Sequence, residues 1–210
     1  MSDTRVRLLE AAERLFAERG LDAVSLREIN QAAGARNAIA VQYHFKDRAG
    51  VIRAILAKHL PDVDARRHAL LDAYEAAGEP DIRQLAAALV RPAAAKLADP
   101  SGGPEFLQIW AGLLNRPAPV VPPEDPVDSI HRWRALVEPL LEADAARLHR
   151  RFAAILYAAI ELARRARSGP RADDRLFTSH LIDMVTAILA APVSAETRRL
   201  AAERDAARSR

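Results

Sequence analysis

The chain has 210 residues, of which half are hydrophobic and only 5% are aromatic, so it is long enough for one large or two small domains with a substantial core. It contains no cysteine, which excludes disulfides and thiolate metal sites. The formal net charge is +3, and all but three of the 31 Lys and Arg residues are arginine. This balance is compatible with binding to DNA but does not establish it.

Composition also bounds the fold class and the compartment. Alanine and leucine supply most of the apolar residues, a mixture that favours closely packed helices over sheets. No apolar run approaches the roughly 18–20 residues that span a bilayer. The segment from Met1 to Leu15 has interleaved charges and no apolar signal-peptide core. We therefore expect an all-α, cytoplasmic protein that does not associate with a membrane.

Two helices are predicted first in the chain. Leucine, alanine and phenylalanine recur at helical spacing over residues 3–19, and Gly20 is placed to end this helix. The second helix opens with Ser25 and Glu28, the spacing of a capping box in which each side chain accepts a hydrogen bond from the other residue's backbone N–H. It closes at Gly34, which can take the positive φ that ends a helix sharply.

A third, very short helix is predicted over about residues 38–44, with Asn37 as its N-cap. Val41 and Phe45 would dock it onto the first two helices, and this packing has to hold it because seven residues are a marginal helix alone. Two helices joined by such a turn are the arrangement that lays one helix in the major groove of DNA. The outer face would offer Ala38, Ile39, Ala40, Gln42 and Tyr43.

The remainder of the chain also reads as helical, with breaks at proline and glycine. We expect Pro61 to kink or end the helix that follows residue 47, and a Pro-rich stretch over 116–126 to form an extended loop. The expected helices are 47–60, 62–77, 82–99, 105–115, 127–142 with an interruption near Pro139, 144–167 and 173–190, followed by an Arg-rich segment over 197–210.

No enzyme motif competes with this pattern. The six histidines are scattered without the paired spacing of a metal site, and there is no Gly-rich phosphate loop or serine elbow. We therefore expect no catalytic residues, no metal site and no cofactor.

Several of these features together resemble the DNA-binding domain of TetR-family transcriptional regulators. They are the first helix, the Ser-Leu-Arg-Glu-Ile run at 25–29, Ala-Ala-Gly at 32–34, and Tyr-His-Phe at 43–45 followed by Arg48 and Val51. The resemblance implies a helix-turn-helix domain over 1–47 and a helical effector-binding and dimerisation domain over 48–210. Two positions depart from the family pattern: one extra residue lies between Gly34 and Phe45, and Gln42 stands where the family has a tyrosine.

The resemblance and the outer face of the short helix together give a set of candidate DNA-contacting residues. Arg48 matches the family's phosphate-gripping base, and Gln42 can read an adenine edge with two hydrogen bonds. Each candidate also has a structural alternative, such as capping, core packing or simple exposure. The full set is Arg27, Arg36, Asn37, Ile39, Gln42, Tyr43, His44 and Arg48.

A single short reading helix contacts few base pairs, whereas two of them about 34–36 Å apart impose a palindromic site. The resemblance implies a homodimer through the helices at 144–167 and 173–190, and a small apolar or amphipathic effector that releases a repressor from its operator in double-stranded DNA. Candidate pocket residues are Phe106, Trp110, Leu113, Trp133 and Tyr157, for which plain core packing is the alternative. The rival function is a helical small-molecule-binding or adaptor protein that no longer binds DNA.

Overall fold

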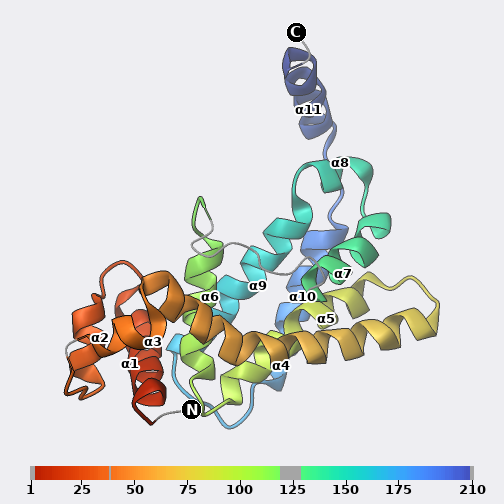
Figure 1. The fold of residues 1–210 in the computed structure, drawn as a ribbon. Helices are drawn as coiled ribbons and strands as arrows, with labels where there is room; N and C mark the ends of the chain where they lie inside the picture. The colour runs from red at the N-terminus through yellow and green to blue at the C-terminus, as the bar shows by residue number, and fades with distance from the viewer. Residues whose placement is uncertain (1–2, 38, 119–128, 209–210) are drawn as a thin grey trace.

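The computed structural model describes residues 3–37, 39–118 and 129–208, and within these ranges the chain is helical and contains no strand. The all-α prediction is confirmed. Figure 1 shows α1, α2 and α3 gathered at one end and the long helix α4 leading away from them. Helices α5, α6 and α7 pack against α4, and α9 and α10 pack against these helices. The last helix extends away from the body of the molecule. Most of the loop expected over 116–126, and Ala38, lie outside the described residues.

The elements follow the predicted order with shifted ends. They are α1 (Asp3–Arg19), α2 (Leu26–Ala32), α3 (Ala40–Phe45), α4 (Arg48–Ala77), α5 (Ile82–Ala94), η1 (Ala95–Ala98), α6 (Gly103–Leu114), α7 (Ser129–Val137), η2 (Glu138–Leu140), α8 (Ala143–Arg147), α9 (Arg150–Arg167), α10 (Arg175–Ala190) and α11 (Ala195–Arg208). The predicted interruption near Pro139 is the short 3-10 turn η2. The predicted domain boundary after residue 47 falls at the N-cap of α4, and the division into two domains stays a prediction.

The capping box predicted for α2 and the helix-ending glycine predicted after it are both confirmed. The Ser25 hydroxyl accepts a hydrogen bond from the Glu28 backbone N–H at 3.2 Å, and the Glu28 carboxylate accepts one from the Ser25 backbone N–H at 2.7 Å. This capping box satisfies two backbone donors that the first turn of a helix otherwise leaves unpaired. Gly34 has the positive φ, +61°, expected of a helix-ending glycine.

The third helix begins two residues later than expected. Ile39 is its N-cap, and Asn37 forms the turn before it: the Asn37 side-chain oxygen accepts from the Ile39 N–H at 3.0 Å, and its carbonyl accepts from the Ala40 N–H at 3.1 Å. An asparagine side chain that bonds two residues ahead mimics a backbone turn. Asn37 therefore organises the approach to α3 rather than capping the helix itself.

Two predictions about helix continuity are wrong. Helix α4, of 30 residues, does not end at Pro61 but runs through it. Pro61 and Ala57 are both exposed, so the Ala57 carbonyl left without its usual N–H partner faces water. Conversely, the helix expected over 144–167 is broken into α8 and α9, because His149 adopts a left-handed backbone conformation with φ +58°.

One continuous apolar core joins the N-terminal helices to the rest of the molecule. It runs from Leu8 in α1 through Phe106 in α6 to Leu189 in α10. One face of helix α5 belongs to this core and packs against both α4 and α10. Helix α6 packs against α9 through small residues, including Ala111 and Ala159. The N-terminal helices are therefore held in a fixed pose by shared packing.

Among the described residues, no single helix is long and apolar enough to cross a membrane. Helices α10 and α11 meet the length and composition criteria only when joined across a bend of 58°.

Gly50 sets the angle between α3 and α4. A Cβ atom on Gly50 would lie 1.7 Å from the carbonyl oxygen of Phe45, the last residue of α3. The Asp47 side chain caps α4 at this point by accepting from the Gly50 N–H at 2.7 Å. Only glycine therefore allows the first turn of α4 to approach the end of α3 this closely.

We expect Gly50→Ala to lower the free energy of unfolding by at least about 2 kcal/mol, because backbone has to move to relieve the collision. Gly112→Ala in α6 is the matched control, since its Cβ would meet only the Leu21 side chain at 3.9 Å. Because alanine favours a helix interior over glycine, Gly112→Ala should raise the free energy of unfolding by about 0.5–1 kcal/mol. Urea unfolding measures the free energy of unfolding of both variants, and equal values for the two would contradict the role assigned to Gly50.

Candidate nucleic-acid interface

Helix α3 is anchored by a buried side chain that the sequence did not single out. Asn30 in α2 is buried, and its side-chain oxygen accepts a hydrogen bond from the Val41 backbone N–H at 3.0 Å. This bond satisfies one of the first N–H groups of α3, which has no capping side chain of its own. Ala40, Val41 and Phe45 are buried beneath the helix. The only sequence signal for Asn30 is a polar residue directly after the buried Ile29.

The opposite face of α3 is open to solvent. Tyr43 is 81% exposed, and Ile39 and Gln42 are also exposed. Arg36 and Asn37 lie exposed in the turn that leads into the helix. A tyrosine so exposed beside a fully packed helix face gains nothing from the core, so its surroundings leave it available for a partner.

His44 and Arg48 are half-buried, in contrast to the exposed residues Ile39, Gln42 and Tyr43. The His44 ring packs edge-on against Tyr43, with ring centroids 5.0 Å apart. The Arg48 guanidinium donates a hydrogen bond to the backbone carbonyl of Leu21, which ties the start of α4 to the turn between α1 and α2. Arg48 thus makes a structural bond, and its guanidinium keeps further N–H donors. Arg27 is exposed on α2.

The structure thus brings the predicted DNA-contacting residues onto one short helix and its flanks, six of them exposed and two half-buried. Their roles toward DNA stay predictions. Arg5 in α1 was not predicted: its guanidinium lies 5.1 Å from the ring centroid of Phe45, and it thereby braces the far end of α3.

Glu28 holds the start of α2 through charge as well as geometry. Its carboxylate accepts from the backbone N–H of Ser25, then from the Ser25 hydroxyl, and pairs with Arg19 at 2.7 Å. These interactions lower the pKa of Glu28 to about 2, with the Ser25 backbone bond the largest cause. The carboxylate therefore stays ionised throughout the physiological range.

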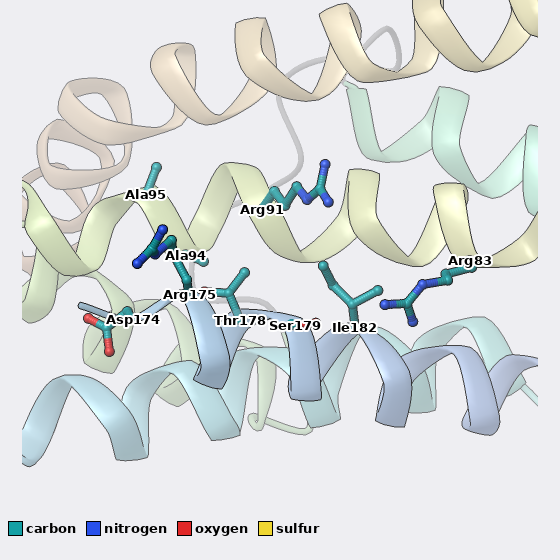
Figure 2. A pocket seen from close by; sticks show the side chains of 9 residues that line it. All are labelled: Arg83, Arg91, Ala94, Ala95, Asp174, Arg175, Thr178, Ser179 and Ile182. Atoms are coloured by element: carbon teal, nitrogen blue, oxygen red, sulfur yellow. The ribbon is translucent and has the colours of Figure 1, made fainter.

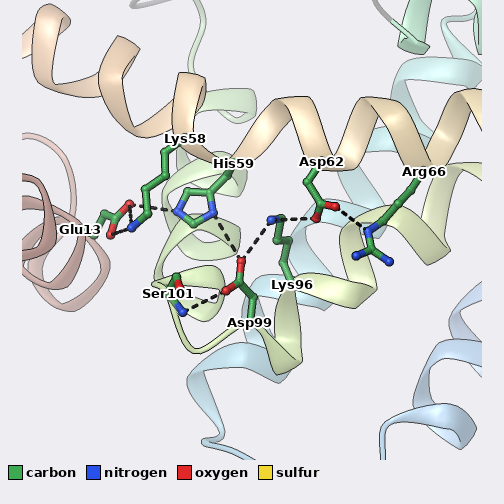
Figure 3. A network of polar contacts seen from close by, with 8 residues as sticks. All are labelled: Glu13, Lys58, His59, Asp62, Arg66, Lys96, Asp99 and Ser101. Atoms are coloured by element: carbon green, nitrogen blue, oxygen red, sulfur yellow. Dashed lines mark hydrogen bonds and ion pairs between the residues drawn. The ribbon is translucent and has the colours of Figure 1, made fainter. Parts of the chain in front are cut away.

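A polar network fills the junction between the N-terminal helices and the rest of the molecule (Figure 3). Glu13 of α1 is 2% exposed and receives bonds from two residues of α4: Lys58 Nζ at 2.7 Å and His59 Nε2 at 2.9 Å. The other ring nitrogen of His59 faces the Asp99 carboxylate at 3.9 Å. Asp99 lies in the turn before α6, so the network joins α1, α4 and α6.

The network continues along α4. Lys96 is buried and pairs with Asp99 at 3.1 Å and with Asp62 at 3.0 Å, and Asp62 in turn accepts from Arg66 at 2.8 Å. The hydrogen bond from Lys96, and then that from Arg66, hold the pKa of Asp62 below its ordinary value. Lys96, a buried cation, is thereby paired with a carboxylate on each of two sides, which offsets the cost of its burial.

The other end of α6 is also tied to the N-terminal helices. Arg116, just after α6, donates two hydrogen bonds to Asp22 in the turn between α1 and α2, at 2.9 and 3.0 Å. The hydrogen bond from Arg116 lowers the pKa of the Asp22 carboxyl. The C-terminal end of α6 is therefore bonded directly to the turn between α1 and α2, whereas the turn before α6 is linked to α1 only through His59 of α4.

The five predicted effector residues are divided between core and near-core positions. Phe106 is buried in α6 and stacks on His59 at 4.7 Å and on Trp110 at 6.2 Å between centroids. Trp133 is fully buried, and its indole N–H donates to the Leu85 carbonyl at 2.8 Å. Leu113 and Tyr157 are half-buried against the same core. In this conformation all five serve packing, and their role toward a ligand stays a prediction.

Two cavities are described, and neither is lined by these five residues. One, of about 400 Å³, lies between α5 and α10. The other, of about 470 Å³, lies between α1, α6 and the end of α9. No group of three acidic or histidine side chains able to hold a metal ion occurs among the described residues.

We expect Glu28→Gln to destabilise the protein in a pH-dependent way. Because the folded-state pKa of Glu28 is lowered from 4.5 to about 2, its stabilisation is present above pH 4.5 and is lost as the pH falls toward 2. The difference in unfolding free energy between wild type and Glu28→Gln should therefore shrink between pH 6 and pH 3 in urea titrations. Glu10→Gln, an exposed change on α1, is the control, and a difference independent of pH would refute the assignment.

Comparison with known proteins bears on the N-terminal helices. The family described as "Bacterial regulatory proteins, tetR family" matches residues 8–55. A crystal structure of a TetR-family regulator from Streptomyces coelicolor A3 is 19% identical, with a TM-score of 0.43, and the similarity covers 89% of this chain and 96% of that chain. Comparison with curated proteins gave no match. The part of the chain that matches this family, residues 8–55, comprises most of α1, all of α2 and α3 and the first turns of α4, and it carries the helix-turn-helix pattern.

Proposed function

We propose that the protein is a cytoplasmic repressor that binds a palindromic operator as a homodimer and leaves it when a small apolar or amphipathic effector binds. The observation that carries the proposal is the exposed face of α3, where Gln42 and Tyr43 stand free above a helix that Asn30 and the core hold rigidly. Side chains fixed on a rigid element can meet base edges without a large ordering cost.

The surroundings of α3 supply the charge that DNA binding needs. Arg27 is exposed on α2, Arg36 is exposed in the turn before α3, and Lys46 is exposed just after α3. Phosphate contacts by such cations position a protein on the duplex, while residues on the reading helix select the bases. Regulators of this family are generally non-enzymatic, in keeping with the expectation from the sequence that the chain is not an enzyme.

Dimerisation through α9 and α10 is supported by exposed apolar side chains on both helices. On α9, Phe152, Leu156 and Ile160 are spaced four residues apart, so they form one stripe, and Ile160 is 42% exposed. On α10, Leu176 is 84% exposed, and Met184 is exposed two turns further along. Large apolar side chains that stay in water in the monomer are typical of a surface that a second copy covers.

Release by an effector needs a path from the sensor helices to α3, and α6 offers one. It packs on α9, which belongs to the proposed dimer, and also on α1. Just after its end, Arg116 bonds Asp22 in the turn between α1 and α2. A ligand that moves α6 would therefore move α3 relative to the dimer axis. A coupling of roughly 1–3 kcal/mol between the two sites changes the operator affinity 5- to 150-fold.

We expect Arg36→Gln to weaken binding to duplex DNA and to make its salt dependence shallower. Each lost phosphate contact should reduce the slope of log affinity against log salt by about 0.9. Arg36 is preferable to Arg48 because Arg48 also holds the Leu21 carbonyl, so its removal would disturb folding. Fluorescence anisotropy with a labelled duplex at several salt concentrations measures the slope.

The control is Arg208→Gln, which removes the same charge at the end of α11. If both variants bind DNA like wild type, Arg36 does not contact phosphate. If the wild type itself does not bind duplex DNA at low salt, the rival function, a helical ligand-binding or adaptor protein, replaces the repressor.

We expect Ile160→Asp to convert the dimer into a monomer, because a carboxylate within the α9 stripe would be buried in the interface without a partner. Sedimentation at micromolar concentration gives the mass directly. Leu200→Asp is the matched control, since Leu200 is 49% exposed on α11, away from α9 and α10. A wild-type monomer, or a dimer that survives Ile160→Asp, would rule out this interface.

A further inference from the structure

The cavity of about 400 Å³ between α5 and α10 has no role in the function proposed above. Figure 2 shows it as a groove with Arg175 at one end, Arg83 at the other and Arg91 on α5 between them. Its volume lies within the range of small-molecule sites.

The floor of this groove is apolar, while its rim is cationic. Ala94, Ala95 and Ile182 supply the apolar lining, and the Thr178 and Ser179 hydroxyls add hydrogen-bonding groups from α10. The combination suits a molecule with an apolar body and an anionic head, because the body covers the floor while guanidinium groups bind the head.

The acidic groups around the groove leave this cationic character in place. Asp174 is turned to the buried Arg165, whose Nε donates to it at 2.6 Å. Arg175 pairs with Asp173 at 2.8 Å, and Arg83 pairs with Asp183. All four partners in these last two pairs are exposed, and exposed ion pairs are weak enough for a ligand anion to replace or share them.

Arg91 is the one rim arginine without a counter-charge. It is exposed on α5, and within the described residues its guanidinium has no hydrogen-bond or ion-pair partner. Arg91 therefore gives the groove an unneutralised positive charge above its apolar lining, between two weakly paired arginines. This charge attracts an anionic head group such as a carboxylate or a phosphate.

We propose that the groove between α5 and α10 binds an amphipathic anion, a medium-length apolar chain that ends in a carboxylate or a phosphate monoester. The head is held by Arg91 together with Arg83, and the chain lies along Ala94, Ala95 and Ile182. This binding is independent of DNA.

Binding in this groove would also act on α10. The exposed pair between Arg83 and Asp183 bridges α5 and α10, so a ligand head that takes Arg83 from Asp183 removes one weak polar contact between the two helices and changes the charge on α10. Helix α10 carries Leu176 and Met184 of the proposed dimer surface. This regulatory consequence, unlike the binding itself, rests on the proposed function.

The test is calorimetric titration of the full chain with decanoate, decyl phosphate, decanol and acetate, each kept below its micelle concentration. We expect saturable binding of one decanoate or decyl phosphate per subunit, and at least tenfold weaker binding of decanol and of acetate. The stronger of decanoate and decyl phosphate identifies the head group.

Two variants locate the site. Arg91→Gln and Arg83→Gln should each weaken decanoate binding about five- to tenfold, since each removes one charged hydrogen-bond donor from a partly exposed site. Arg208→Gln, with the same loss of charge on α11, should bind like wild type. Both arginines are exposed, so the variants should keep the wild-type melting temperature.

The proposal is overturned if decanol binds as well as decanoate, or if decanoate binds with equal affinity to Arg91→Gln, Arg83→Gln and wild type. Adding decanoate to the DNA titration tests the regulatory step separately. If decanoate binds but leaves the DNA affinity unchanged, the groove remains a binding site but has no link to repression. If the protein without any ligand does not bind DNA, the proposed function fails, whereas the calorimetric test of the groove is unaffected.

Discussion

The pose of the DNA-reading helices depends on one buried carboxylate. Glu13 lies in α1 where the N-terminal helices meet α4 and the turn before α6, and it is 2% exposed. A buried carboxylate is strongly unfavourable unless it is paired and hydrogen-bonded, and Lys58 and His59 provide both. The turn can approach because Gly102 has no Cβ, which would lie 2.5 Å from a Glu13 carboxylate oxygen. The charge therefore fixes one arrangement of α1, α4 and α6.

Other contacts impose a similar constraint at the C-terminal end of α6 and among the helices α1, α2 and α3. Arg116 and Asp22 join the end of α6 to the turn before α2, and Arg48 joins the start of α4 to that same turn. Asn30 and Gly50 then fix α3 against α2 and α4. The packing of α3 on α4, and the turn at Asp22 that precedes α2, thus link the N-terminal helices to α4 and α6, which is the path that the proposed release by an effector uses.

The local elements could be predicted from the sequence because their causes are local. The capping box at Ser25 and Glu28 and the exposed face at Gln42 and Tyr43 follow from spacing alone. Periodicity does not reveal the roles of Asn30 and Glu13, because their partners lie 11 or more positions away in the sequence. It does not reveal that of Gly50 either, because this glycine is required by a close backbone approach. The effector site could not be predicted for a related reason. An aromatic residue at helical spacing, such as Trp133, has the same pattern whether it packs in a core or lines a pocket.

The central claim is that two copies of α3 are held at a fixed spacing and read DNA together. The most direct test is to select the purified protein against a pool of random duplexes and to sequence those it retains. The account predicts a palindrome whose half-sites are separated by a constant distance, with centres about one helical turn or a multiple of it apart. Recovery of single half-sites, of half-sites at variable spacing or of no motif at moderate salt would contradict it.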